Sequence, residues 1–342
     1  MNPHFFYPLF IALLFAAGSC NQKKDNSATQ TQTEEQTPAQ PPKRQSPPLP
    51  YIYPVGQATG SVATGIFTYP EPPFAITDLE AQVDYVTEHF WDSFKFNDTL
   101  SIYQPEIRSE VFMAYIALLH YADKEVAGKS IEKTLSNAEA EKTGAVYAFF
   151  VDGFKTYLHD PNSIIRNDEF YIPVLQHIIA SERTDYADRE RAKFNLETAM
   201  KNRVGEKASD FTYTLSSEKT GALYDIEAKY TLIYFYNPDC HTCAETMEQL
   251  KISPFITQKI KNGELNILAF YPDEDLEIWK KHLSDVPKEW INGYDGDHIV
   301  RAQNLYDLKA IPTLYLLDSN KRVLLKDAAS VQVVDQYFQV NR

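Results

Sequence analysis

Two cysteines separated by two residues are the strongest chemical signal in this sequence. They stand in the segment Cys240-His241-Thr242-Cys243, directly after the apolar run 232–236. A dithiol on the turn between a strand and a helix is suited to thiol–disulfide exchange, because one sulfur can attack while the other resolves. The chain contains three cysteines, so the role of the remaining one decides whether this pair stands alone.

The remaining cysteine, Cys20, closes an N-terminal apolar segment that runs from Leu9 to Ala17. This segment is shorter than the roughly 20 apolar residues that span a bilayer, so we interpret 1–20 as a targeting signal. Its small-small-Cys ending resembles the lipobox of bacterial lipoproteins, in which the cysteine is acylated. Two features depart from that pattern: no Lys or Arg precedes the run, and Ala17 replaces a leucine. A cleaved secretory signal with an incidental cysteine is the alternative.

Lipid attachment at Cys20 is the interpretation we favour, because a lone exposed thiol is a liability in an oxidising compartment. Asn21 is not the aspartate that retains lipoproteins at the inner membrane in Gram-negative systems. The resemblance therefore implies an outer-membrane anchor, with the folded chain facing the periplasm. Residues 21–50 are rich in Gln, Thr, Glu and Pro, which predicts a disordered linker.

Length and charge limit the remaining choices. A chain of 342 residues has room for two domains with separate cores. The net charge of −14 argues against a nucleic-acid partner, because such partners require basic patches.

Residues 51–203 have the periodicity of an all-α helical domain. Thr77-Asp78-Leu79-Glu80 predicts a capping box at the start of one helix. Further helices are expected over 107–118, 127–141, 144–158, 168–181 and 185–201. The aromatic residues at helical spacing are interpreted as core rather than as a ligand groove: Phe90, Trp91, Phe94, Tyr147, Phe149 and Phe150. His89, His120, His159 and His177 are interpreted as structural or surface residues.

Residues 204–342 alternate between strand and helix patterns. Strands are expected over 211–215, 229–236, 265–271, 313–318 and 322–326. Helices are expected over 240–250, 254–262, 276–283 and 298–308, and from Val331 onwards. This order predicts an α/β domain with a mixed sheet covered on both faces.

The second domain resembles the thioredoxin superfamily, and within it the TlpA-like thiol–disulfide proteins of bacterial envelopes. The resemblance covers about 203–342 and depends on the dithiol together with Ala310-Ile311-Pro312-Thr313 and the strand that follows. It implies a thioredoxin-like fold and a cis peptide at Ile311-Pro312. In the family, Ile311, Pro312 and Thr313 would face the dithiol and pair with an extended substrate segment. The helical domain resembles a domain of unassigned activity that precedes thioredoxin-like domains in Bacteroidetes lipoproteins.

The resemblance assigns different roles to the two sulfurs. Attack requires a thiolate, and Cys240 would lie at a helix N-terminus, where unpaired N–H groups and the helix dipole favour negative charge. Cys243 would lie one turn further in, more buried and with a higher pKa. Cys240 is therefore the expected nucleophile and Cys243 the resolving residue, with protein thiols and disulfides of the cell envelope as partners. This chemistry calls for no cofactor and no metal, but a membrane redox donor or acceptor is expected to recycle the dithiol.

The direction of exchange stays open between a reductant near −270 mV and an oxidant near −120 mV, roughly. A protonated His241 would stabilise the thiolate and make the protein more oxidising; alternatively it is an exposed residue with a modest effect. Thr242 and Asp239 are the other tuning positions, and Tyr234 stands where thioredoxin buries an acid. Ile311 before the proline resembles reducing members, which favours a reductase.

Three alternatives compete with this hypothesis. A zinc site would need two further ligands, and His282 and His298 are not spaced as a ligand pair. A purely structural disulfide would close a very small loop and constrain the unfolded chain little. From a different class, the chain could be a binding or scaffold lipoprotein that uses its helical domain and carries a redox-inert thioredoxin-like module.

Overall fold

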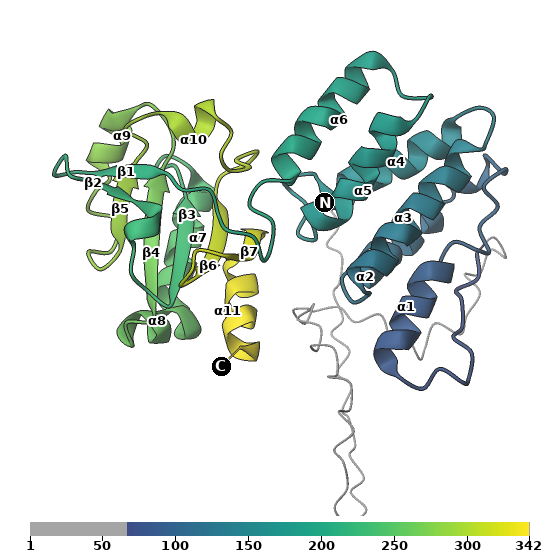
Figure 1. Ribbon diagram of the computed structural model, residues 1–342, viewed down its shortest axis with the longest axis horizontal. Helices are drawn as coiled ribbons and strands as arrows, with labels where there is room; N and C mark the ends of the chain where they lie inside the picture. The colour runs from purple at the N-terminus through teal and green to yellow at the C-terminus, as the bar shows by residue number, and fades with distance from the viewer. Residues whose placement is uncertain (1–66, 342) are drawn as a thin grey trace, which may run out of the picture. The chain divides into compact units, whose positions relative to one another are not determined.

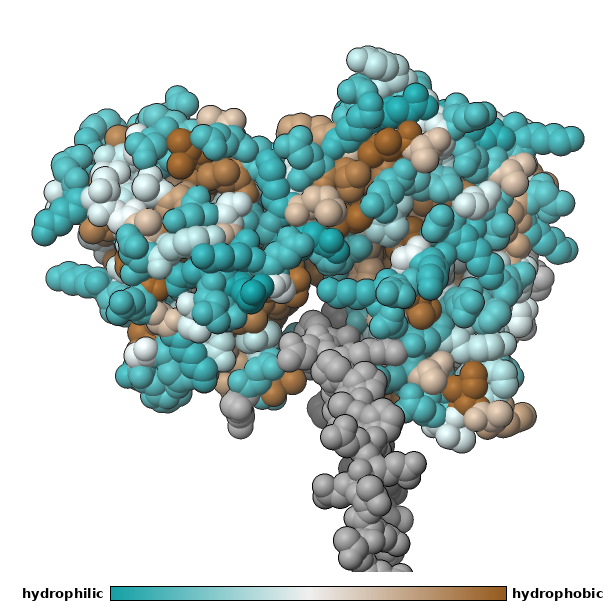
Figure 2. Space-filling model, viewed as in Figure 1, coloured by the Kyte–Doolittle hydropathy of each residue, from teal (hydrophilic) through white to brown (hydrophobic). Residues whose placement is uncertain are grey.

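The computed structural model describes residues 67–341, which form a helical domain followed by an α/β domain (Figure 1). The expectations for the signal segment 1–20, the linker 21–50 and the lipid site Cys20 fall outside the described residues, as does the start of the helical domain. Within 67–341, no helix is long and apolar enough to cross a membrane. Figure 2 shows a surface on which hydrophilic residues predominate, in keeping with the net charge of −14.

The described residues up to Ala199 form a helical domain, which confirms the expected fold class for this part of the chain (Figure 1). Its α-helices are α1 (Leu79–His89), α2 (Phe112–Leu119), α3 (Lys124–Glu139), α4 (Ala145–Leu158), α5 (Asp168–Ala180) and α6 (Tyr186–Ala199). A 3₁₀ turn (Ser101–Tyr103) and a π-helical segment (Ile107–Val111) lead into α2. Helix α3 contacts α1, α4 and α5, so it lies at the centre of the domain.

Polar caps fix where these helices begin. The Asp123 carboxylate accepts a hydrogen bond from the first turn of α3, which therefore starts earlier than the predicted 127. The predicted capping box at Thr77 is wrong by one residue. The N-cap of α1 is Asp78, whose carboxylate accepts from the Ala81 backbone N–H at 2.9 Å. Aspartate and threonine both cap well, so the sequence pattern does not choose between them.

Aromatic side chains fill the core of the helical domain, as predicted. Trp91 lies edge-on to Phe150, with ring centroids 4.9 Å apart. Phe90, Trp91, Phe94, Tyr147 and Phe150 are buried, and Phe149 packs against them. The four histidines of this domain make packing or pairing contacts: His89 with Asp92, His120 with Phe170, His159 with Tyr171 and His177 with Glu139. The aromatic residues are therefore part of the core, and the histidines are structural or surface residues, as predicted.

A mixed sheet organises the second domain, in the strand order β2-β1-β5-β4-β3-β6-β7. The strands are β1 (Thr212–Leu215), β2 (Thr220–Ala222), β3 (Tyr230–Phe235), β4 (Leu265–Tyr271), β5 (Ile291–Tyr294), β6 (Thr313–Asp318) and β7 (Val323–Ala328). Strand β4 runs parallel to β3 and β5, whereas β6 runs antiparallel to β3 and β7. This arrangement is the thioredoxin-like mixed sheet that the sequence predicts.

Side chains that alternate along β3 enter two separate cores. Leu232 and Tyr234 pack on one face with helices α7 (His241–Ile252), α8 (Pro254–Lys261), α9 (Leu276–Lys281) and α11 (Val331–Val340). Ile233 and Phe235 pack on the other face with Phe211 and with α10 (Ile299–Ala302). The central strand is therefore buried on both sides, which explains the apolar run 232–235 within it.

Three elements differ from the predictions. Strand β2 was not predicted, because Thr220-Gly221-Ala222 is short and contains a glycine. Strand β5 was not predicted, because Asn292-Gly293 is typical of a turn. A Cβ on Gly293 would come within 3.1 Å of Tyr213, so the glycine permits the close approach of β1. The helix predicted over 298–308 ends at Ala302, since Asn304 adopts a φ of 48° and turns the chain.

Candidate active site

A turn at the end of β3 delivers Cys240 to the start of α7. The Cys240 backbone N–H donates to the Asn237 carbonyl at 3.1 Å, and the Asn237 side-chain oxygen accepts from the Asp239 N–H at 3.0 Å. Cys240 itself is the N-cap residue of α7: its Sγ accepts a hydrogen bond from the Cys243 backbone N–H at 3.2 Å. The sulfur therefore occupies the position where helix N–H groups stabilise a negative charge.

The two sulfurs lie in different environments. Cys240 is half-buried, whereas Cys243 is only 1% exposed, and both are free thiols. Burial raises the pKa of the Cys243 thiol well above its ordinary value; a backbone hydrogen bond from Asn237 opposes the rise, and the Cys240 sulfur adds to it. Cys243 is therefore the more buried of the two sulfurs, as expected, and its burial disfavours the thiolate.

The loop before β6 faces the same end of the sheet as the dithiol. Register explains this placement: Thr313 pairs with Phe235, so the residues before β6 lie beside those that follow β3. The Ile311-Pro312 peptide is cis, as the family resemblance predicts. The Ile311 carbonyl lies 3.7 Å from Cys240 Sγ, within reach of its S–H group. The Thr313 hydroxyl donates to the Ala310 carbonyl at 2.6 Å and braces the loop.

The positions expected to tune the dithiol lie on the surface. The His241 side chain is 87% exposed, and its Nδ1 lies 3.6 Å from Glu245 Oε1. Solvent screens a charge on a side chain this exposed, which favours a modest effect of His241 on the Cys240 thiolate. Thr242 is exposed, and the exposed Asp239 carboxylate lies 3.6 Å from His282 Nε2.

Tyr234 lies where thioredoxin has a buried acid, and it makes a structural contact with the active-site helix. Its hydroxyl donates to the Cys243 carbonyl at 2.6 Å, and its ring stacks on Tyr236 with centroids 5.2 Å apart. Burial, with Cys243 as the next contribution, raises the pKa of Tyr234 far above 10. The phenol therefore remains neutral beside Cys243.

The sequence pattern did not reveal several residues that support the site. Asn237 Nδ2 donates to Asp273, which also accepts from Arg301 Nε, both at 2.8 Å. These side chains hold the loop before Cys240 from two distant segments. A cavity of about 170 Å³ adjoins Cys243 and is lined also by His282, whose Nδ1 lies 2.8 Å from Asp285. The i, i+3 spacing of His282 and Asp285 was the available signal. Within residues 67–341, no group of three His, Cys, Asp or Glu residues is placed to hold a metal ion.

Two family models match the chain. One is described as a domain of unknown function (DUF5106) and matches residues 19–202. The other is described as thioredoxin-like (Thioredoxin_8) and matches residues 227–323. No curated protein matches the chain.

Solved structures extend this picture. The chain is similar to a thioredoxin-like protein from Bacteroides caccae at 44% identity and a TM-score of 0.75, over 81% of this chain and 99% of that one. A C-terminal domain of an uncharacterized Bacteroides fragilis protein is 55% identical over 40% of this chain and 98% of its own, with a TM-score of 0.40. The thioredoxin domain of a Bacteroides vulgatus thiol-disulfide oxidoreductase is 21% identical over 41% of this chain and 96% of its own, with a TM-score of 0.35. The chain belongs to the thioredoxin-like family, and a DUF5106 helical domain precedes its thioredoxin-like domain.

Proposed function

We propose that the protein is a thiol–disulfide oxidoreductase that acts through Cys240 and Cys243. One observation carries the proposal: Cys240 Sγ caps α7 within reach of the Ile311 carbonyl, while Cys243 is buried one turn behind it. A half-buried sulfur that accepts a helix N–H is suited to attack. A buried thiol with a raised pKa stays protonated, and it is suited to attack only after a mixed disulfide has formed beside it.

In the reducing direction, the Cys240 thiolate attacks one sulfur of a substrate disulfide. A bond forms between Cys240 Sγ and the attacked sulfur, the substrate S–S bond breaks, and the other substrate sulfur leaves as a thiolate. Cys243 then gives its proton to that thiolate or to water and attacks Cys240 Sγ. This second step forms the Cys240–Cys243 disulfide and releases the second substrate thiolate, so two electrons pass from the dithiol to the substrate. The reverse sequence oxidises a dithiol substrate.

The loop Ile311-Pro312-Thr313 is the proposed platform for the substrate. Proline has no N–H group, and the backbone beside it is free to pair with an extended segment. Ile311 and Pro312 are partly exposed next to the half-buried Cys240, so a disulfide in that segment would reach the sulfur. The isoleucine at this position favours a reductase, and a reduction potential measured against glutathione tests the direction.

We further propose that the protein works in the cell envelope, anchored by a lipid on Cys20 to the outer membrane and facing the periplasm. The linker 21–50 would hold the folded domains away from the bilayer. Its partners would be envelope proteins with thiols or disulfides and a membrane redox donor or acceptor. Metabolic labelling with palmitate tests the anchor: the wild type should carry the label, and a Cys20→Ala variant should not.

Insulin reduction by the purified full chain tests the exchange function. The wild type should accelerate the reduction of insulin by dithiothreitol, and Cys240→Ser should not. A wild-type rate equal to that of Cys240→Ser would contradict the proposal and favour a redox-inert scaffold protein.

A further inference from the structure

Buried charges connect the helical domain to the thioredoxin-like domain. Arg166 and Asp168 from the helical domain meet Asp307, Lys309, Lys326 and Asp327 from the thioredoxin-like domain, and we call these six residues the interface charge cluster. Their side chains are between 6% and 17% exposed. Charges buried to this extent are retained only when partners compensate them, so each one constrains the position of its neighbours.

Two interactions hold β7 against the helical domain. Arg166 binds Asp327 through two bonds, at 2.7 Å from Nε and 2.9 Å from Nη2. Lys326 Nζ lies 3.0 Å from Asp168 Oδ2 and donates to the carbonyls of Ala199 and Lys201. These contacts join the start of α5 and the end of α6 to one strand of the sheet.

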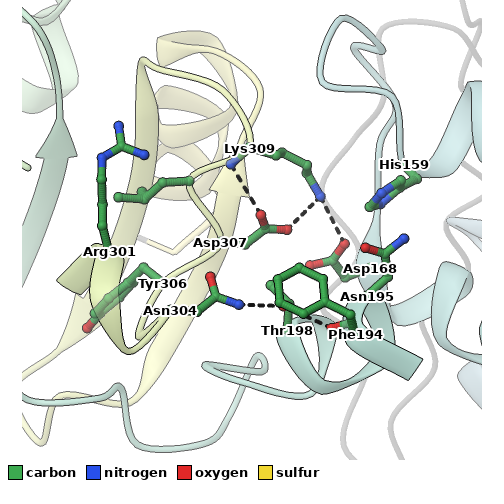
Figure 3. Close-up of a pocket in the computed structure, with 11 residues that line it drawn as sticks. His159, Asp168, Phe194, Asn195, Thr198, Arg301, Asn304, Tyr306, Asp307 and Lys309 are labelled. Carbon is green, nitrogen blue, oxygen red and sulfur yellow. Dashed lines mark hydrogen bonds and ion pairs between the residues drawn. The ribbon is translucent and has the colours of Figure 1, made fainter. Parts of the chain in front are cut away.

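A third interaction involves Lys309, on the segment that leads to the cis-proline. Lys309 Nζ lies 3.4 Å from Asp168 Oδ1 and 2.7 Å from Asp307 Oδ2, as the dashed lines in Figure 3 show. Burial alone would lower the pKa of Lys309, but Asp168 and Asp307 raise it. Burial alone would raise the pKa of Asp168, but Lys326 and Lys309 lower it. Both groups therefore stay charged near neutral pH and attract each other.

Lys309 lies two residues before Ile311, whose carbonyl is 3.7 Å from Cys240 Sγ. Within this stretch, the Lys309 backbone N–H donates to Asp307 Oδ1 at 3.3 Å. Beside it, a cavity of about 240 Å³ is lined by Lys309, Asp168 and residues of both domains (Figure 3). The cavity leaves this side of Lys309 loosely packed, so the ion pair with Asp168 adds a restraint that ties the loop to the helical domain.

We propose that the DUF5106 helical domain positions the cis-proline loop for protein substrates, and that Asp168 is the positioning residue that acts through Lys309. The inference rests on the proposed exchange function and gives the helical domain a part in it. A protein disulfide needs the loop as a docking edge, so the rate of its reduction should depend on the Asp168–Lys309 pair. A small aromatic disulfide reaches Cys240 without the loop, so the rate of its reduction should not depend on the pair.

The test compares two substrates across a set of full-length variants. Asp168→Asn and Lys309→Met should each lower kcat/KM for insulin reduction about tenfold, mainly through KM. Their reduced forms should react with 5,5′-dithiobis(2-nitrobenzoate) within twofold of the wild-type rate. The double variant should lose less than the two single losses combined, because both changes remove the same Asp168–Lys309 pair. Arg203→Gln is the matched control: it breaks the pair with Glu169, 2.6 Å from Nη2, and leaves Lys309 untouched. It should keep the wild-type insulin rate.

Hydrogen exchange of the amides in 305–313 gives a readout that needs no activity. Asp168→Asn should speed this exchange, and Arg203→Gln should not. The inference would be overturned if the Asp168→Asn variant folds, reduces insulin with wild-type kinetics and shows unchanged hydrogen exchange in 305–313. An equal loss on insulin and on the small disulfide would also overturn it, because that result indicates general damage. A wild type as inactive as Cys240→Ser would instead refute the proposed thiol–disulfide exchange function. The hydrogen exchange of the loop amides would then decide whether Asp168 holds the loop.

Discussion

Replacing Arg166 by methionine should destabilise the protein in a strongly pH-dependent way. Arg166 and Asp327 form a two-bond ion pair in which both side chains are 10% exposed. Methionine keeps most of the apolar bulk but leaves the Asp327 carboxylate without this partner. Burial already raises the pKa of Asp327 in spite of Arg166. Loss of the arginine charge should raise that pKa further.

Protonation of Asp327 sets an upper limit on the cost. Neutralising an aspartate whose ordinary pKa is about 3.9 costs about 1.4 kcal/mol for each pH unit above that value. The free energy of unfolding should therefore fall by up to about 4 kcal/mol at pH 7, and by at most about 1.5 kcal/mol at pH 5. The sign follows from a folded-state pKa above the unfolded one: the penalty is absent below pH 4 and grows as the pH rises.

Urea unfolding at pH 5 and pH 7 measures this difference. Trp91 reports on the helical domain, and Trp279 and Trp290 report on the thioredoxin-like domain. Asp327→Asn in the Arg166→Met background should recover most of the loss at pH 7, because it removes the unpaired charge. A loss below about 1 kcal/mol at pH 7, or an equal loss at both pH values, would refute the reasoning.

Three further predictions concern single groups. The mixed disulfide of Cys240 with a substrate peptide should resolve about tenfold faster for each pH unit between 7 and 9. The reason is that the thiolate fraction of Cys243 grows in that proportion below its raised pKa. A resolution rate that does not change with pH in stopped-flow experiments would contradict this. Tyr234→Phe should lower the free energy of unfolding by about 1 kcal/mol, because the hydrogen bond to Cys243 is lost. The rate of insulin reduction should stay within threefold of the wild-type rate. A tenfold lower rate would show that the phenol takes part in thiol–disulfide exchange. Burial lowers the pKa of His120 to about 4, below its unfolded value near 6.5, so this residue should contribute a loss of about 3 kcal/mol in stability between pH 6.5 and 4. In urea titrations, the wild type should lose about 3 kcal/mol more than a His120→Phe variant over this range, and equal losses would contradict the prediction.

Strand and helix patterns were sufficient for the elements that carry the dithiol. Strand β3 contains most of the apolar run 232–236, and β6 has the predicted bounds, Thr313–Asp318. Local signals failed where packing overrides propensity. Gly293 lies in β5 because β1 approaches too closely for a Cβ, and Asn304 ends α10 with a left-handed backbone. Neither constraint is visible in a single sequence, because the contacting residues lie far away along the chain.

In the candidate site, too, some residues were predictable from the sequence and others were not. Cys240, Cys243 and Pro312 were predictable, because their types and order are specific. Their supporting partners were not, because Asn237, Asp273 and Arg301 meet only through folding. The Asp168–Lys309 pair joins residues 141 positions apart and leaves no periodic trace in the sequence.

Trapping of the mixed disulfide tests the central claim, that Cys240 attacks and Cys243 resolves, most directly. A Cys243→Ser variant expressed in the cell envelope should accumulate dithiothreitol-sensitive adducts, and mass spectrometry should locate them on Cys240. A Cys240→Ser variant should accumulate none. The absence of adducts on Cys243→Ser, or their appearance on Cys240→Ser, would contradict the assigned roles.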